Sequence, residues 1–89
     1  MENVNYEELI SKQVRAEVNL WFELEDDVEN VIIHNLRLAR IVGSKFTYRA
    51  IVEFFSKRTH EIEIAMVVVR VDEFGANVTS EKRTDGAWK

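Results

Sequence analysis

Hydrophobic and polar residues alternate along several segments of the chain, and this pattern predicts a largely β structure. In residues 14–24 every even position is apolar, and the odd positions are polar except Trp21. Residues 45–56 and 61–72 alternate in the same way. Because successive side chains of a strand point to opposite faces of a sheet, a period of two over these lengths predicts three strands.

The segment after the first of these strands fits two structures. Residues 31–42 are rich in β-branched side chains, which favour a strand. On a helical wheel, however, residues 28–42 gather their apolar side chains on one side, Asp26 can cap such a helix, and Gly43 can end it. We favour the strand, and the alternative is a helix over 28–42 within a β-α-β-β core.

The two ends of the chain carry weaker signals. Asn5 can cap a helix, and Glu8 follows it at the capping-box spacing, so a short helix is predicted over residues 5–12. Residues 80–89 are mostly polar and are predicted to form a flexible tail. The predicted fold is therefore one α+β domain over residues 1–79, with a short N-terminal helix followed by a four-stranded antiparallel meander sheet.

Gly43 and Ser44 suit a two-residue hairpin loop, and the turns determine which side chains share a face. An uninterrupted pairing from this loop places Phe46, Tyr48 and their alternate neighbours on the core face. Residues 57–59 are predicted to form the next turn, and the same alternation is extended to the strand that follows. On this register the second face holds Trp21, Ile32, Leu36, Leu38, Ile51, Phe55, Val67, Val69 and Val71.

The second face is expected to be an interface. A short helix covers one face of a four-stranded sheet, so the apolar patch on the other face would exceed what is usual on a monomer. We expect a second copy of the chain to cover it, in a homodimer or higher homo-oligomer, and another protein to bind the chain as well. The predicted interface residues are Trp21, Ile32, Leu36, Leu38, Ile51 and Phe55.

Composition narrows the class of protein. The chain has 89 residues, 46% of them hydrophobic and 31% charged, which is typical of one small folded domain. No apolar run approaches the roughly 20 residues of a membrane span. The absence of cysteine excludes disulfides and thiolate metal sites, and a domain this small without disulfides is expected to be cytoplasmic.

The net charge of −4 is unevenly distributed along the chain. Residues 1–30 carry a net charge of −7, residues 31–60 carry +5, and residues 61–89 carry −2. Cations suited to phosphates or to an acidic protein surface gather around the predicted hairpin. A nucleic-acid-binding protein is therefore the second functional prediction, with contacts from Arg37, Arg40, Lys45 and Arg49.

Candidate catalytic residues are few. His34 lies opposite Glu53 in the predicted register, an arrangement that suits a general base and its orienting carboxylate, although a structural pair across the strands is favoured. A small enzyme centred on this pair is the least favoured alternative. Two distant histidines without cysteine do not make a metal site, so neither a metal nor a cofactor is expected.

These observations favour a non-enzymatic protein–protein interaction module. We expect a small dimeric adaptor, inhibitor or regulator that acts through a sheet face or a sheet edge. No sequence motif identifies its partner.

Overall fold

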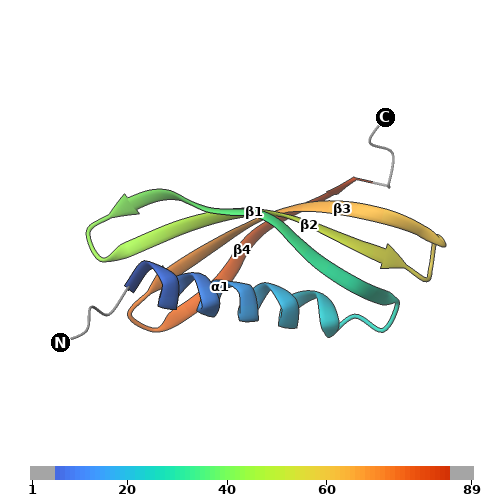
Figure 1. Ribbon diagram of the computed structural model, residues 1–89, viewed down its shortest axis with the longest axis horizontal. Helices are drawn as coiled ribbons and strands as arrows, with labels where there is room; N and C mark the ends of the chain where they lie inside the picture. The colour runs from blue at the N-terminus through green and yellow to red at the C-terminus, as the bar shows by residue number, and fades with distance from the viewer. Residues whose placement is uncertain (1–5, 85–89) are drawn as a thin grey trace.

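The computed structural model describes residues 6–84, which form one N-terminal helix and a four-stranded antiparallel sheet (Figure 1). The predicted fold class is confirmed, because each strand pairs with the next along the chain in a meander. In this part of the chain, no helix has the length and hydropathy that a membrane span requires. The elements are α1 (Tyr6–Glu23), β1 (Val28–Val42), β2 (Lys45–Ser56), β3 (Glu61–Asp72) and β4 (Gly75–Thr84).

Helix α1 occupies the segment for which the alternation predicts a first strand. The strand over 14–24 is wrong, and the short helix over 5–12 is wrong in its length, because α1 has 18 residues. Asn5, the predicted cap, lies outside the described residues. Glu7 and Glu8 lie in the first turn, where acidic side chains interact favourably with the helix dipole.

The apolar even positions of this segment fit a helix as well as a strand. Alternate even positions are four residues apart, and residues at i and i+4 lie on the same face of a helix. The even positions thus divide into two series on different faces of α1. The series facing the sheet, which is fully buried, is Val14, Val18 and Phe22. The exposed series on α1 is Ala16 and Leu20, and Leu24, directly after the helix, is exposed as well.

Strand β1 confirms the favoured structure for the ambiguous segment, so the alternative helix over 28–42 is wrong. The Gly43–Ser44 loop is also confirmed, with Val42 opposite Lys45. The uninterrupted pairing is wrong, since β1 shifts register between Glu29 and Ile32, between His34 and Arg37, and between Leu38 and Arg40. Each shift inserts one residue into β1 and moves the following side chains to the other face.

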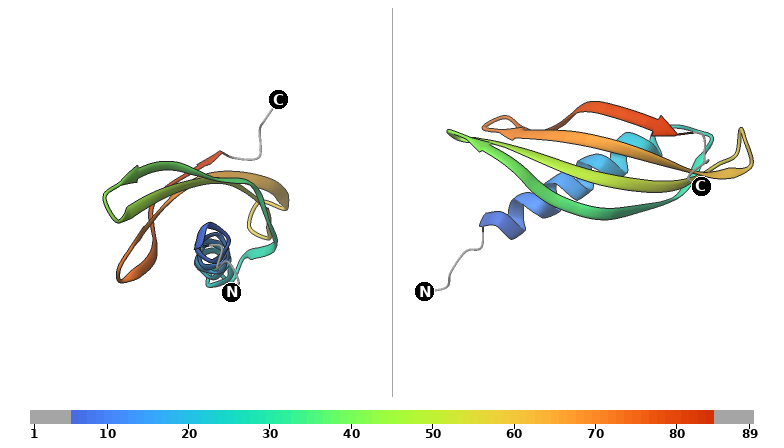
Figure 2. Two further views of the ribbon diagram at one scale, coloured as in Figure 1. Left: turned by 60° about the vertical axis from the view of Figure 1, so that its left-hand side comes forward. Right: turned by 90° about the horizontal axis from the view of Figure 1, so that it is seen from above.

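Two asparagines lie within these irregular stretches of β1. Asn30 has a φ of 56° and Asn35 a φ of 52°, a left-handed conformation that asparagine tolerates better than most residues. Bulges of this kind bend a strand and increase its twist. The sheet correspondingly curves around α1, which lies on its concave side (Figure 2).

The connection between β2 and β3 is one residue longer than predicted. Ser56 pairs with Glu61, so residues 57–60 form a four-residue loop in place of a three-residue turn. His60 closes it with a φ of 61°, and its backbone N–H donates to the carbonyl of Ser56 at 2.7 Å. One additional loop residue exchanges the two faces of β3. As a result Val67, Val69 and Val71 face α1, not the second face.

Strand β4 extends to the middle of residues 80–89, the predicted flexible tail. It runs to Thr84, so the boundary at residue 80 is wrong, and residues 85–89 lie outside the described part of the chain. Pairing extends from Gly75 opposite Asp72 to Thr84 opposite Ile64.

The core lies between α1 and the concave side of the sheet. The aromatic face of the β1–β2 hairpin contributes to it, as predicted, and the rings of Phe22 and Phe54 lie 5.2 Å apart. The buried apolar residues are Val14, Val18, Phe22, Tyr48, Ala50, Val52, Phe54, Ala65, Val67, Val69 and Val71. The other side of the sheet is not covered by any described element (Figures 1 and 2).

Candidate functional site

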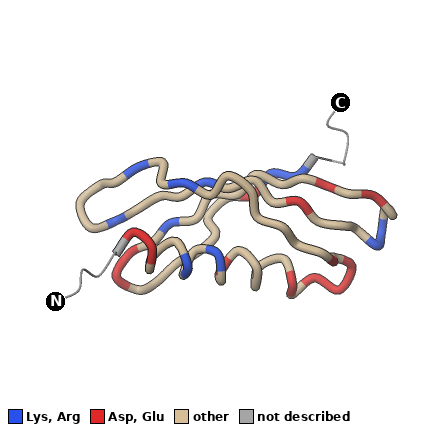
Figure 3. The backbone as a smooth tube through the Cα atoms, in the orientation of Figure 1, with Lys and Arg blue, Asp and Glu red and all other residues tan. Residues whose placement is uncertain are grey.

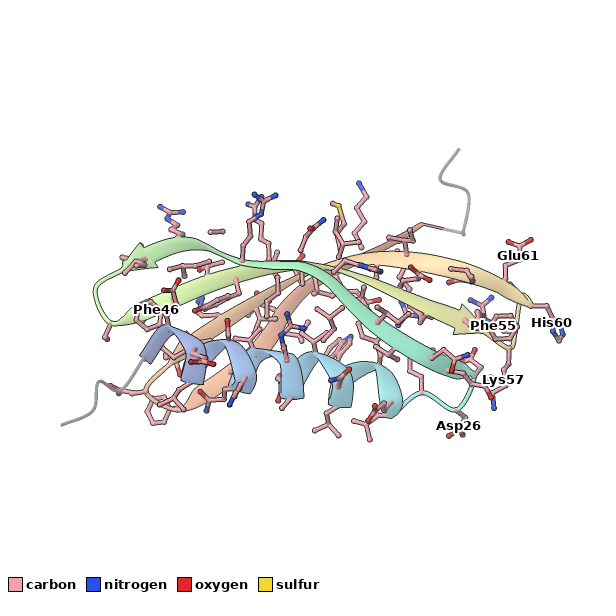
Figure 4. All side chains as sticks on the ribbon, viewed as in Figure 1. Asp26, Phe46, Phe55, Lys57, His60 and Glu61 are labelled. Atoms are coloured by element: carbon pink, nitrogen blue, oxygen red, sulfur yellow. The ribbon has the colours of Figure 1, made fainter. Side chains whose placement is uncertain are left out.

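The candidate site is the face of the sheet turned away from α1, which we call the open face. Side chains stand on this side along the whole length of the sheet (Figure 4). The register fixes its members, because they alternate with the buried residues of each strand. The outward positions between the strand ends are Glu29, Ile32, His34, Arg37, Arg40, Thr47, Arg49, Ile51, Glu53, Phe55, Ile62, Ile64, Met66, Val68, Arg70, Asn77, Ser80 and Lys82.

The open face has two chemically different ends. Toward the Gly43–Ser44 loop lies the arginine end, which comprises Arg37, Arg40, Arg49 and Arg70. Toward the loop over residues 57–60 lies the apolar end, which comprises Ile32, Ile51, Phe55, Ile62, Ile64 and Met66. Acidic residues lie mostly at the ends of α1, in the loops at the two ends of the molecule, and on the half of the sheet toward the loop over residues 57–60 (Figure 3).

Strand register brings the four arginines together. Arg37 lies directly opposite Arg49, and Thr47 lies between Arg40 and Arg70 on the neighbouring strands. All four side chains are exposed. None of them forms an ion pair with another residue of the described chain.

The carboxylates nearest to the open face are engaged elsewhere. Among its outward positions Glu29 and Glu53 are acidic, and Glu53 forms a pair with His34 at 3.0 Å. At the margins of the sheet, Glu29 pairs with Lys57 at 3.5 Å, and Asp72 accepts the backbone N–H of Phe74 at 2.8 Å. The arginine end therefore holds four guanidinium groups that pair with no carboxylate of the described residues.

The pair formed by Arg37 and Arg49 is unfavourable for folding. Like charges directly opposite one another in an antiparallel pair destabilise a sheet, whereas opposite charges there contribute roughly 0.2–1 kcal/mol. A carboxylate in place of either arginine would pair with the remaining one and stabilise the sheet.

The apolar end is accessible to solvent. Its most exposed side chains are Ile62 (54%), Ile32 (48%) and Met66 (48%), and the remaining three are half-buried. A shallow hollow at this end is lined by Ile32, Phe55 and Ile62. The open face is therefore neither a solvated polar surface nor a single charged patch.

A second shallow hollow lies where the two ends meet. Arg37 and Arg49 line it together with Ile51, Met66 and Lys82. A ligand seated there would touch guanidinium groups and aliphatic side chains at once.

The predicted site residues separate into two groups. Ile32, Ile51 and Phe55 lie on the open face as predicted, and so do Arg40 and Arg49. Arg37 also lies there, opposite Arg49, although the uninterrupted pairing places it opposite Ala50 on the core face. Lys45 is exposed at the end of β2, beside the hairpin loop.

Three predicted interface residues lie elsewhere. Trp21 is on α1, where its Nε1 donates to Glu81 Oε1 at 2.9 Å. Leu36 and Leu38 pack against the core on the helix side of the sheet. Their assignment to the second face is wrong because the bulges of β1 shift the register beyond Arg40.

Several residues of the open face were not among the predicted site residues. Arg70 and Lys82 add cations from β3 and β4, and Ile62, Ile64 and Met66 supply half of the apolar end. The alternation of residues 61–72 does group the β3 members on one face. The length of the preceding loop decides which face that is, and sequence alone does not determine this length.

The predicted proximity of His34 and Glu53 is confirmed, although His34 lies opposite Ile51 and reaches Glu53 diagonally. Their side chains are 45% and 33% exposed. Exposed pairs of this kind contribute about 0–1 kcal/mol. The pair lies on an open surface and not in an enclosed cleft of the kind that surrounds most small-molecule substrates.

The acidic segment after α1 binds cations of the same chain. Glu25 pairs with Arg83, and Asp27 pairs with Arg58 at 3.5 Å. The backbone N–H of Lys57 also donates to the carbonyl of Asp27 at 2.7 Å. These contacts join the loop after α1 to the far end of the sheet.

Comparison of the chain with protein-family models, with curated proteins and with solved structures finds no match. The functional argument therefore rests on the chemistry of the open face.

Proposed function

We propose that this chain is a non-enzymatic protein–protein interaction module that binds its partner on the open face. The observation that carries the proposal is an exposed apolar end beside four arginines without ion-pair partners among the described residues. Protein interfaces combine apolar residues with arginine, and arginine is among the residues that contribute most to binding. An adaptor, an inhibitor or a regulator would each use such a face.

The dimensions of the open face support this function. From the row of Arg40 and Arg70 to the row of Phe55 and Ile62, strands β2 and β3 each advance eight residues, or about 27 Å. Four strands are about 14 Å across. With the added area of protruding side chains, this footprint is on the scale of a small to standard interface, which buries about 800 Å² per partner.

The charge distribution favours a different protein over a second copy. Two open faces stacked over their whole length place the arginine end against the other arginine end or against the apolar end. The first arrangement brings like charges together, and the second buries guanidinium groups without acceptors. The homodimer expected from the sequence stays a prediction, and it is one outcome of the tests below.

Nucleic-acid binding is the second candidate, because the arginine end could contact phosphates. Two features favour a protein instead. The arginine end lacks aromatic side chains on which bases would stack. The apolar end would have no role in holding a phosphate backbone.

Replacing Ile62 and Met66 together by aspartate is expected to weaken partner binding at least about tenfold, because two charges would be buried against the partner. The probes are 20-residue peptides selected from a random display library on the wild-type protein. Their dissociation constants for wild type and for Ile62→Asp/Met66→Asp are measured by isothermal titration calorimetry.

Leu9→Asp/Leu20→Asp is the matched control. Both leucines lie on α1 and are 52% exposed, so two exposed aliphatic side chains are again replaced by carboxylates. We expect this variant to bind the selected peptides as wild type does. Peptides that lose affinity for the α1 variant and keep it for the β3 variant would show that the helix surface, not the open face, is the interface.

A further inference from the structure

We infer that the partner is an acidic, amphipathic protein segment that lies along the strands of the open face. Its carboxylates would meet the arginine end, and its aliphatic or aromatic side chains would meet the apolar end. This inference rests on the proposed function and adds the chemistry and the direction of the partner to it.

The spacing of the arginines suits several carboxylates at once. Arg37 and Arg49 are neighbours across β1 and β2, and Arg40 and Arg70 are two strands apart, or about 10 Å. Guanidinium groups bind carboxylates through two parallel hydrogen bonds. Two to four acidic side chains within one or two turns of a helix, or along a short strand, would satisfy this end.

The change in chemistry along the strands distinguishes a polypeptide from a nucleic acid. A nucleic acid carries phosphates along its whole length, so a strand running from the arginine end would also place phosphates over Ile51, Met66 and Ile62. It would approach the carboxylate of Glu53 there as well. A polypeptide can be acidic at one end and apolar at the other, which matches the open face over its full length.

The length of the open face sets the length of the segment. About 27 Å corresponds to about eight residues in an extended conformation or about 18 residues in a helix. The hollow between the two ends, lined by Arg37, Ile51 and Met66, is where an acidic and an apolar side chain of the segment would lie next to each other.

The test uses the 20-residue peptides selected on the wild-type protein. We expect their sequences to be enriched in acidic and large apolar residues, with a net charge of about −3 or lower. Arg37→Glu/Arg49→Glu is expected to weaken their binding at least about 100-fold. This variant replaces one like-charge pair by another, so its thermal unfolding is expected to stay close to that of wild type.

Lys12→Glu/Arg15→Glu is the control with the same change in net charge. Both side chains are exposed on α1, away from the open face. We expect this variant to change the affinity of the peptides less than threefold. A general electrostatic effect of the added negative charge would instead weaken binding in both variants equally.

Several outcomes would overturn the inference. Neutral or basic selected peptides would contradict it, as would peptides that bind Arg37→Glu/Arg49→Glu as tightly as wild type. If peptides of either kind still lose affinity for Ile62→Asp/Met66→Asp, the open face remains the interface, and only the inference that the partner is acidic is wrong. If neither variant affects them, or if no peptide is enriched, the proposed function fails as well.

Two alternative occupants are tested with the same proteins. A 20-nucleotide single-stranded DNA and a 20-base-pair duplex that bind wild type more tightly than any peptide, and fail to bind Arg37→Glu/Arg49→Glu, would replace the protein segment by a nucleic acid. A dimer measured by light scattering that Ile62→Asp/Met66→Asp dissociates would identify the occupant as a second copy of the chain.

Discussion

Phe22→Ala is expected to lower the free energy of unfolding by about 3–5 kcal/mol. The side chain of Phe22 is fully buried, and its ring packs against Phe54 with the centroids 5.2 Å apart. A domain of this size has a total stability on the order of 4–13 kcal/mol. The substitution therefore removes a large part of the stability, and urea denaturation followed by circular dichroism measures the loss.

Leu20→Ala is the control for this prediction. Leu20 is exposed on the other side of α1, and alanine is a better helix former than leucine, so we expect a loss below about 1 kcal/mol. In a strand over residues 14–24, Leu20 and Phe22 would share one face and their losses would be similar. Equal losses in the two variants would contradict α1.

Arg83→Met is expected to lower the free energy of unfolding by about 2–3 kcal/mol, because Arg83 holds β4 against the end of α1. Its guanidinium group lies over the rings of Phe22 and Phe54, at 5.2 and 5.1 Å from their centroids. It also donates hydrogen bonds to Glu25 and Glu81. Methionine keeps part of the packing but leaves two carboxylates near each other without a cation.

Glu25 and Glu81 stabilise the charged form of Arg83. Burial alone lowers the pKa of its guanidinium group, but the hydrogen bonds and charges of Glu25 and Glu81 outweigh burial and raise the pKa above its ordinary value. Arg83 therefore stays protonated at every pH at which the protein is studied. Trp21 extends the network, since its Nε1 donates to the same Glu81.

Lys57→Met is the control for Arg83→Met. It removes an ion pair with Glu29 in which both side chains are about half exposed, and such pairs contribute about 0–1 kcal/mol. Both losses are measured by urea denaturation. If Arg83→Met costs no more than Lys57→Met, the network around Arg83 does not stabilise the packing of α1 on the sheet.

Local sequence was sufficient to predict the centre of the sheet. Gly43 and Ser44 specify a tight hairpin, and the β-branched residues of β1 favour a strand over the alternative helix. The alternation in β2 placed Phe46, Tyr48 and Phe54 on the core face. These predictions depend only on neighbours in the chain, and for that reason they agree with the structure.

The incorrect predictions concern properties that neighbouring residues do not determine. Apolar residues at every even position fit a strand, yet they also place Val14, Val18 and Phe22 on one helix face, and only packing against the sheet distinguishes the two. The bulges at Asn30 and Asn35 and the additional loop residue His60 each change the face of every side chain that follows.

The candidate site was predicted only in part, because the strand register is one of the properties that neighbouring residues do not determine. Positions close to the Gly43–Ser44 loop, such as Arg40 and Arg49, lie on the predicted face of the sheet, although Arg49 is opposite Arg37 and not Leu38. Leu36 and Leu38, beyond the bulges, lie on the other face. Arg70 joins the arginine end through the pairing of β2 with β3, which sequence patterns do not reveal.

Arg49→Glu separates a role in binding from a role in folding. It places a carboxylate opposite Arg37 and converts a like-charge pair into an ion pair. We predict that the free energy of unfolding rises by roughly 0.2–1 kcal/mol. We also predict that the affinity for the peptides selected on the wild-type protein falls at least about tenfold. A less stable variant that binds those peptides as wild type does would contradict a partner-binding role for the open face of the sheet.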